Sequence, residues 1–407
     1  MISIRKILFF LIFSFSCTSY VRSGVELTFL IVLTGFTICV SKHGVKKDLL
    51  RYIKFPFLLI FIGLINAPNN SNSDIIKDVY YFLNPIVIFS FGYYIAYFIK
   101  LKDFITFVLK ISIFLSFVYL VNYLQNFGSF RSVKELKEIV GMPSYIIPVA
   151  LFILGYKLKN KQKVLRKYDT PVFFLLLSVL LLSLSRTFFL ALFILLIFSS
   201  GFIKLNETFL VRVAFVSICL FSIFYFTSQS ANDDRNTFQG KIFTSFNEVK
   251  FSDYKSKDDI NENWRGYESF MGLKQYSKGN DLEKIIGQGL GKNTPLGLEI
   301  TLGFNTFAVI PKFHNGFITL LVKTGLLGVI SYLLFFINLI RKSSKRQSTY
   351  TSDYLFVNRL IIGFTIVILS TTYIISGWLN NGTLSFLILS LGYFINYKNY
   401  ILRENIN

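Results

Sequence analysis

Twelve apolar runs, most of them close to the length of a membrane-crossing helix, fill the sequence outside one polar segment. A bilayer core about 30 Å thick needs roughly 20 apolar residues per helix. The runs lie at about 6–21, 25–41, 52–67, 79–99, 104–124, 140–156, 170–185, 187–203, 209–227, 314–340, 355–376 and 383–401. Charged residues make up only 16% of the chain, whereas a soluble domain carries about 25%. The pattern predicts an all-α polytopic membrane protein with about 12 transmembrane helices in a single integral membrane domain, residues 1–407.

The formal net charge of +21 would suggest a nucleic-acid partner in a soluble protein. Here most lysines and arginines stand in short loops between apolar runs, so we expect membrane lipids rather than a nucleic acid as their surroundings. Alternate loops hold most of these basic residues, above all at 157–167 and 341–346. Because basic loops stay in the cytoplasm, both termini are predicted to be cytoplasmic, and the polar segment 228–312 is predicted to be a large extracytoplasmic loop.

The first apolar run, within MISIRKILFFLIFSFSC, resembles the core of a signal peptide because basic residues precede it. No small-x-small cleavage site follows, and a second apolar run begins almost at once, near Val25. We therefore expect an uncleaved first helix.

The cysteines and the paired acids do not indicate a metal site. Cys17, Cys39 and Cys219 all lie within apolar runs and lack the spacing of metal ligands, so they are expected to be small core residues. The acidic pairs at 233–234 and 258–259 stand in the polar segment, where such pairs are mostly solvated. We therefore predict neither a disulfide nor a bound metal.

One apolar stretch, about 170–203, is interrupted only by Ser185, Arg186 and Thr187. A straight helix of that length would measure about 50 Å at 1.5 Å per residue, which is too long for one crossing without strong tilt. Two short crossings joined by a tight turn at Arg186 fit the bilayer better. Without this turn every later loop would change sides, and the basic loop at 341–346 would lie outside.

The polar segment changes character at Trp264. Before it, stretches such as SQSANDDRNTFQGK are polar and turn-like. From it, WRGYESFMGLKQYSK places Tyr267, Phe270 and Met271 at helical spacing, which predicts an amphipathic helix on the membrane face. A glycine-rich turn, GQGLGKNTPLG, follows this helix.

The glycines of that turn, Gly287, Gly289 and Gly291, do not form a nucleotide-binding motif. Lys292 is followed by Asn293 rather than by serine or threonine, so the phosphate-loop pattern fails. The dinucleotide pattern also fails, because no strand and acidic partner frame the glycines. We expect the turn to allow a close backbone approach to a sugar or a phosphate.

Two arginines, Arg186 and Arg265, are candidates for binding an anionic group. Arg186 stands within the apolar run LLLSLSRTFFLALF, where it either snorkels from a hairpin tip or faces a polar cavity. Arg265 follows Trp264 at the start of the loop helix, where it either contacts solvent and lipid headgroups or binds the same anion. A planar guanidinium group matches the geometry of a phosphate.

His314 and Asn315 open the apolar run HNGFITLLVKTGLLGVISYLLFF directly after the polar segment. The chain has only two histidines, and this one stands at the boundary between loop and bilayer. It is either an interfacial residue at a helix start or a functional group, since imidazole titrates near neutral pH and helix N-termini attract anions. As a functional group it would be a general base or a phosphate ligand, with Asn315 and Gly316 as further donors.

Four sequence features together resemble the O-antigen polymerase and O-antigen ligase superfamily. They are SLSRT in a mid-chain run, Trp264-Arg265 at the start of a late exterior helix, the G-x-G-x-G turn, and HNGFITLLVKTGLLG entering a helix. Residues 264–336 are similar to the C-terminal polymerase and ligase module of that superfamily, and SLSRT is a second anchor. The first stretch, about 1–140, matches in general hydropathy alone.

The resemblance implies a multi-pass glycosyltransferase of the bacterial cytoplasmic (inner) membrane that needs neither a metal nor another cofactor. Its donor would be an oligosaccharide on undecaprenyl diphosphate, and the lipid diphosphate would leave. Arg186 and Arg265 would hold this diphosphate, and His314 would either deprotonate the acceptor hydroxyl or contact the diphosphate. Further substrate-binding residues would be Trp264, Gly289, Gly291, Lys292 and Asn315. Partners from the same pathway would be a flippase and a chain-length regulator.

The resemblance leaves more than one activity open. A surface-polysaccharide polymerase, for O-antigen or capsule, would transfer the glycan to a sugar hydroxyl of another lipid-linked repeat unit, whereas a ligase would transfer it to the lipid A core. The bias toward Phe, Ile, Lys, Asn and Tyr indicates AT-rich coding, which is common in surface-polysaccharide loci and favours the polymerase. A lipid-linked oligosaccharide flippase is the non-enzymatic alternative. Transporters, however, usually contain internal repeats and lack a large exterior loop like the one predicted at 228–312.

Overall fold

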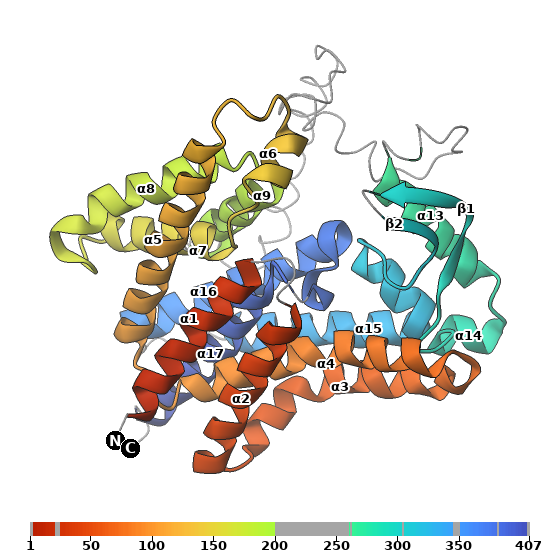
Figure 1. The fold of residues 1–407 in the computed structure, drawn as a ribbon. Helices are drawn as coiled ribbons and strands as arrows, with labels where there is room; N and C mark the ends of the chain where they lie inside the picture. Colours follow the sequence, from red (N-terminus) through yellow and green to blue (C-terminus); the bar gives the residue numbers. More distant parts are fainter. Residues whose placement is uncertain are drawn as a thin grey trace.

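The computed structural model describes residues 3–20, 25–199, 260, 263–302, 305–344, 351–380 and 382–404. Within these ranges the chain is mostly helical (Figure 1). The helices are α1 (Ile4–Tyr20), α2 (Val25–His43), α3 (Lys47–Ile65), α4 (Asn72–Ile95), α5 (Leu101–Gln125), α6 (Val133–Ile139), α7 (Ile146–Lys159), α8 (Asp169–Leu182), α9 (Arg186–Ile194), α13 (Trp264–Ser277), α14 (Asp281–Ile286), α15 (Gly316–Ser344), α16 (Ser352–Ile375) and α17 (Ser385–Glu404). The predicted all-α class is confirmed, apart from one antiparallel hairpin of β1 (Thr294–Leu302) and β2 (Asn305–Ile310) that the sequence pattern did not predict.

Five of the described helices are long and apolar enough to cross a membrane. They are α2 over Glu26–His43, and α4, α5, α15 and α16. The run at about 209–227 lies outside the described residues, and other predicted spans form shorter helices, such as α7 and α8 with 14 residues each. The chain therefore has the helices of a membrane protein, whereas the count of about 12 spans and their orientation remain predictions.

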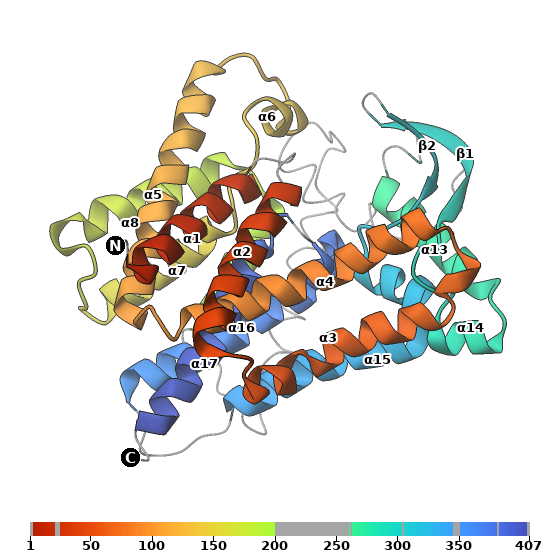
Figure 2. The same cartoon turned by 60° about the horizontal axis from the view of Figure 1, so that its bottom comes forward.

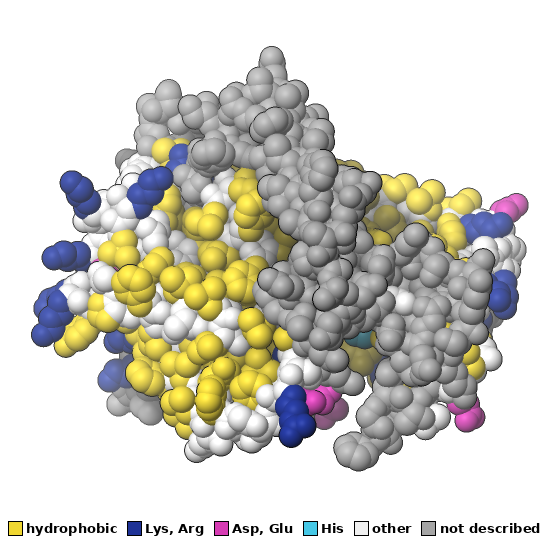
Figure 3. All heavy atoms as spheres, turned by 90° about the horizontal axis from the view of Figure 1, so that it is seen from above, with side chains coloured by type: hydrophobic (Ala, Val, Ile, Leu, Met, Phe, Trp, Pro, Cys, Tyr) yellow, Lys and Arg dark blue, Asp and Glu magenta, His cyan; other side chains and the backbone are white. Residues whose placement is uncertain are grey.

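The surface of α15 carries a stripe of exposed apolar side chains. Leu326, Ile330, Leu334 and Ile337 recur at helical spacing, and all four side chains are exposed. Figure 3 shows apolar side chains spread over one face of the molecule, with lysine and arginine side chains toward its margin. An exposed apolar stripe of this kind is stable against hydrocarbon rather than against water.

The helices α4 and α17 are far apart in sequence but pack against each other in the main apolar core. Gly92 of α4 lies against the backbone carbonyl of Leu389, and Gly392 of α17 lies against that of Phe89. A Cβ atom at either glycine would overlap the opposing backbone. The two glycines therefore permit an unusually close approach of the two helices, as small residues do in membrane bundles.

The long apolar stretch at about 170–203 is interrupted where the sequence predicts. α8 ends at Leu182, Leu184 adopts a left-handed backbone with φ 44°, and α9 begins at Arg186. The two helices do not pack side by side as a hairpin would. Both contact α7, but α8 also packs against α5, whereas α9 also packs against α16. The break places Arg186 in the first turn of a helix.

A second, smaller apolar cluster joins α13, the β-hairpin and the start of α15. It consists of Ile260, Tyr267, Leu296, Ile310, Phe313, Ile318 and Val322. Figure 1 shows α13, α14 and the hairpin gathered at one end of α15. Figure 2 shows α3 and α15 running alongside each other toward this group, and α3 also contacts α4.

The glycine-rich turn lies in close contact with both the α3–α4 connection and a kink in α15. Gly287, Gly289 and Gly291 have φ values of 87°, 91° and 85°, a backbone that other residues rarely adopt. Asn66 Nδ2 donates to the Gly287 carbonyl at 2.6 Å, and a Cβ atom on Gly289 would overlap the backbone of Asn66. On the other side, Gly325 breaks α15 with φ 63° and lies against the backbone of Gly287. The close approach that these glycines allow is thus to the chain's own backbone.

A buried ion pair ties the same turn to α4 and α15. Lys323 of α15 donates to Asp78 Oδ2 of α4, and the two side chains are only 1% and 3% exposed. That oxygen also accepts the Gly291 N–H at 2.6 Å, and Lys323 Nζ donates to the Lys292 carbonyl at 3.2 Å. The pair therefore fixes the turn as well as joining the two helices.

Candidate functional site

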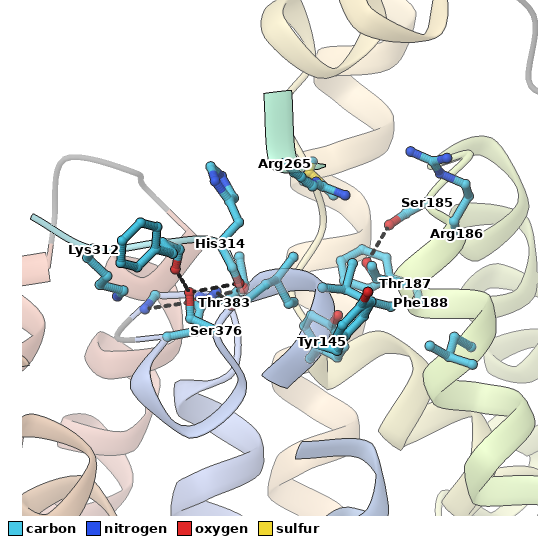
Figure 4. Close-up of a pocket in the computed structure, with 18 of the residues that line it drawn as sticks. Tyr145, Ser185, Arg186, Thr187, Phe188, Arg265, Lys312, His314, Ser376 and Thr383 are labelled. Carbon is cyan, nitrogen blue, oxygen red and sulfur yellow. Dashed lines mark hydrogen bonds between the residues drawn. The ribbon is translucent and has the colours of Figure 1, made fainter. Parts of the chain in front are cut away.

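A cavity of about 920 Å³ lies where the start of α9, the start of α13 and the start of α15 converge (Figure 4). Arg186 comes from α9, Arg265 from α13, and His314 lies two residues before the start of α15; all three line the cavity. These are the three residues that the sequence marks as candidates for chemistry. The fold brings them around one space, although they belong to separate parts of the chain.

Helix N-termini add to the positive character of the cavity. Arg186 is the first residue of α9, and Arg265 is the second residue of α13. α15 begins at Gly316, and Asn315 caps it because its Oδ1 accepts the Phe317 N–H at 3.0 Å. The first N–H groups of a helix lack carbonyl partners within it and carry a partial positive charge. An anion in the cavity would therefore meet helix starts as well as guanidinium groups.

Cationic side chains outnumber acidic ones around the cavity. The cations are Lys137, Arg186, Arg265 and Lys312, and the carboxylate among the described lining residues is that of Glu26. Such an imbalance in a concave site concentrates anions. Aromatic residues form much of the remaining wall, namely Tyr80, Tyr81, Tyr145, Phe188, Phe313 and Tyr373. The lining therefore suits a ligand with both an anionic group and an apolar part.

His314 is held in place by α13 and by the turn that follows α16. Its Nδ1 lies 2.7 Å from Glu268 Oε2, and its backbone N–H donates to the same oxygen at 3.2 Å. Its carbonyl accepts the Ser376 N–H at 2.5 Å, where Ser376 has a left-handed φ of 67°. The His314 side chain is 47% exposed, whereas that of Glu268 is 5% exposed. The imidazole is thus held by Glu268 at its Nδ1 and remains partly exposed where it lines the cavity.

Lys312 reaches the cavity from the link between β2 and α15. Its Nζ donates to the Leu379 carbonyl at 2.6 Å and lies 4.7 Å from the centroid of the Tyr81 ring. Burial lowers the pKa of Lys312 to about 8, while the charge of Asp78 opposes this shift and that of Lys323 adds to it. Lys312 is therefore a cation near neutral pH that loses its charge under mildly alkaline conditions.

Binding of inorganic pyrophosphate in the cavity should weaken as the pH rises through about 8, because Lys312 loses its proton there. Calorimetric titration of the purified protein on both sides of this pH measures the change in Kd. The folded chain should meanwhile gain stability between about pH 8 and the ordinary lysine range, since only the unfolded chain binds that proton there. Weaker binding would therefore not reflect unfolding.

The control for this pH dependence is Lys312→Arg, whose guanidinium stays charged throughout the range. Its pyrophosphate affinity should not decline near pH 8. An equal decline in the variant and in the wild-type protein would show that another group controls binding.

Five predicted substrate-binding residues are not part of the cavity lining: Trp264, Gly289, Gly291, Lys292 and Asn315. The two glycines approach the α3–α4 connection, as described above. Trp264 packs against the smaller apolar cluster, with its ring centroid 6.2 Å from that of Tyr267. Asn315 caps α15, and the Lys292 carbonyl accepts a hydrogen bond from Lys323 Nζ. Each of these residues has a structural role within the chain, and contact with a substrate remains a prediction for all five.

Two residues of the site, Glu268 and Lys312, were not selected from the sequence. Glu268 follows Arg265 by three positions in a helix, so the two residues stand on neighbouring positions of one helix face. An acid at this spacing from a candidate arginine was a usable signal. Lys312 offered no such signal, because a lysine in a polar loop is ordinarily solvated.

Among the residues that the structure describes, no group of three or more His, Cys, Asp or Glu side chains could hold a metal ion. The acidic pairs at 233–234 and 258–259 lie outside those residues.

Comparison of the chain with models of known protein families and with curated proteins gave no match. A function must therefore be inferred from the cavity and from the motifs that line it.

Proposed function

We propose that the chain is a surface-polysaccharide polymerase of a bacterial inner membrane. It transfers a glycan from undecaprenyl diphosphate to a sugar hydroxyl of another lipid-linked repeat unit. The observation that carries the proposal is the position of Arg186, Arg265 and His314 around one cavity. Such a transfer needs fixed cations for an anionic leaving group and a base for a hydroxyl, close to one another.

In the proposed reaction, the anomeric carbon of the donor glycan exchanges one oxygen for another. The bond to the diphosphate oxygen breaks and its electron pair leaves with the lipid diphosphate. The bond to the acceptor oxygen forms, and the proton of that hydroxyl passes to His314. Arg186 and Arg265 stabilise the negative charge that grows on the leaving group, since each guanidinium can donate two parallel hydrogen bonds.

The remaining lining supports the same substrate class. Lys137 and Lys312 add positive charge, and the aromatic wall offers an apolar surface for the non-ionic part of the ligand. The exposed apolar stripe of α15 indicates that the helix starting at the cavity borders lipid. A lipid-linked anion combines these features in one molecule.

Purified protein supplied only with undecaprenyl-diphosphate repeat units in liposomes should produce a ladder of longer lipid-linked glycans. His314→Ala should slow ladder formation by about 100- to 10,000-fold, the range expected for loss of a general base. His43→Ala is the matched control, because His43 is the other histidine of the chain. His43 is the last residue of α2, and its ring stacks on that of Tyr97 with the ring centroids 4.9 Å apart. It should leave the rate unchanged.

The same assay separates the alternative functions. Transfer that appears only after lipid A core is added would make the chain a ligase. No transfer to either acceptor, together with movement of the lipid-linked glycan between leaflets, would make it a flippase. A ladder that persists at full rate in His314→Ala would remove His314 from the mechanism.

A further inference from the structure

The buried carboxylate of Glu268 contacts His314 twice. Glu268 stands in the second turn of α13 and is 3% exposed. Its Oε2 accepts the backbone N–H of His314 at 3.2 Å and lies 2.7 Å from the ring Nδ1. Since α13 packs against the start of α15, the contact belongs to the interface between two helices that border the cavity.

This contact determines which ring nitrogen carries the hydrogen. A carboxylate oxygen can only accept, and this one already accepts the backbone N–H. Beside an ionised Glu268, Nδ1 donates, and a neutral imidazole then keeps its lone pair on Nε2. The ring lines the cavity, and in the view of Figure 4 it extends between Lys312 and Arg265. The lone pair is thus on Nε2, the ring nitrogen that does not contact Glu268.

We infer that Glu268 is a positioning residue that holds His314 as the Nδ1–H tautomer, so that Nε2 accepts the proton of the acceptor hydroxyl. The catalytic part of this inference rests on the proposed function. It also selects between the two roles that the sequence leaves open for His314. A bare Nε2 has no hydrogen to donate to a diphosphate oxygen, so the arginines bind the anion and His314 acts as the base.

The carboxylate has a second effect during the reaction. When the hydroxyl proton moves to Nε2, the ring becomes an imidazolium ion 2.7 Å from Glu268. A fixed negative charge at that distance stabilises the cation without any rearrangement, as in other base–carboxylate pairs. Because the His314 side chain is 47% exposed, the proton can then leave to solvent and restore the neutral ring.

Nitrogen-15 NMR of histidine-labelled protein in detergent tests the tautomer without any turnover. The chain has two histidines, so His43→Gln leaves the signals of His314 alone. At mildly alkaline pH these should show a protonated Nδ1 and a bare Nε2. Glu268→Ala removes the acceptor and should move hydrogen to Nε2. Glu268→Gln keeps an acceptor oxygen and should preserve the tautomer while losing the charge.

Ladder formation by the same proteins gives the second readout. Glu268→Ala and Glu268→Gln should each slow transfer by at least about 100-fold, the lower end of a general-base effect. Gln275→Ala is the control, because it removes another α13 hydrogen bond, the 2.7 Å contact with Gln288, without touching His314. It should alter neither the spectrum nor the rate.

A hydrogen on Nε2 in the otherwise wild-type protein would overturn the inference, as would a spectrum that Glu268→Ala does not change. If Glu268→Ala fails to fold, the spectrum of the otherwise wild-type protein still tests the tautomer, and wild-type transfer by Glu268→Gln would separately exclude a role for the charge. Failure of the proposed function has a different signature. The wild-type protein would then make no ladder, while the spectra would still show whether Glu268 sets the tautomer.

Discussion

Replacing Arg265 with alanine should lower the rate of the proposed glycan transfer by about 100- to 1,000-fold, and the same change at Arg186 should have an effect of the same order. Both guanidinium groups line the cavity at helix starts, where the proposed diphosphate gains negative charge as it leaves. Because that charge grows toward the transition state, the rate constant should fall more than the affinity for donor. Initial rates of ladder formation over a range of donor concentrations separate the two quantities.

Arg265→Lys and Arg186→Lys should also lose most activity, since an ammonium group cannot form two parallel hydrogen bonds with a phosphate. The control is Arg51→Ala, because the Arg51 side chain is 76% exposed and pairs with Asp48 of its own helix at 3.4 Å. That change should leave the rate as it is. Wild-type rates in both lysine variants would instead identify Arg186 and Arg265 as side chains that merely reach toward the membrane surface.

The largest loss of stability is expected from Lys323→Met. It would leave the carboxylate of Asp78, which is 3% exposed, with the Gly291 N–H but without its cation. Breaking a buried pair from one side costs about 3–5 kcal/mol, because the remaining charge stays desolvated. Denaturant unfolding of the purified protein in detergent measures the free energy of unfolding.

The double variant Asp78→Leu/Lys323→Met should recover part of that loss, since no unpaired charge remains. Recovery should be incomplete, because the Gly291 N–H and the Lys292 carbonyl also lose their partners. Lys284→Met, which breaks an exposed pair with Asp281, serves as the control and should change little. A double variant no more stable than Lys323→Met would contradict the view that the buried charge causes the loss.

The candidate residues could be found in the sequence because each is out of place there. Arg186 interrupts an apolar run, where a charged side chain is costly unless it faces a polar cavity, and His314 begins another run at the boundary between loop and bilayer. Their convergence with Arg265 could not be read from local pattern, because it depends on how α9, α13 and α15 pack. The expectation that the three residues act at one site came from the motifs taken together.

Contacts between distant segments explain most of what the sequence did not predict. The glycines of the turn indicate a positive φ, but not that Asn66, 221 positions away, supplies the hydrogen bond. Glu268 and His314 are likewise 46 positions apart. The sequence did predict a break near Arg186, but not that α8 and α9 would pack against different neighbours, α5 and α16, instead of against each other as a hairpin.

The crossing of α4 and α17 also sets an order in time. α4 leaves the ribosome early, whereas α17 is the last helix that the structure describes. Until α17 has been synthesised, Gly92 has no opposing backbone to pack against, and the helix that carries Tyr80 and Tyr81 into the cavity wall lacks its principal neighbour. The enclosure around the arginines is therefore completed only once α17 has been synthesised, and a chain truncated before α17 would carry Arg186, Arg265 and His314 without the packed helix that supports the cavity wall.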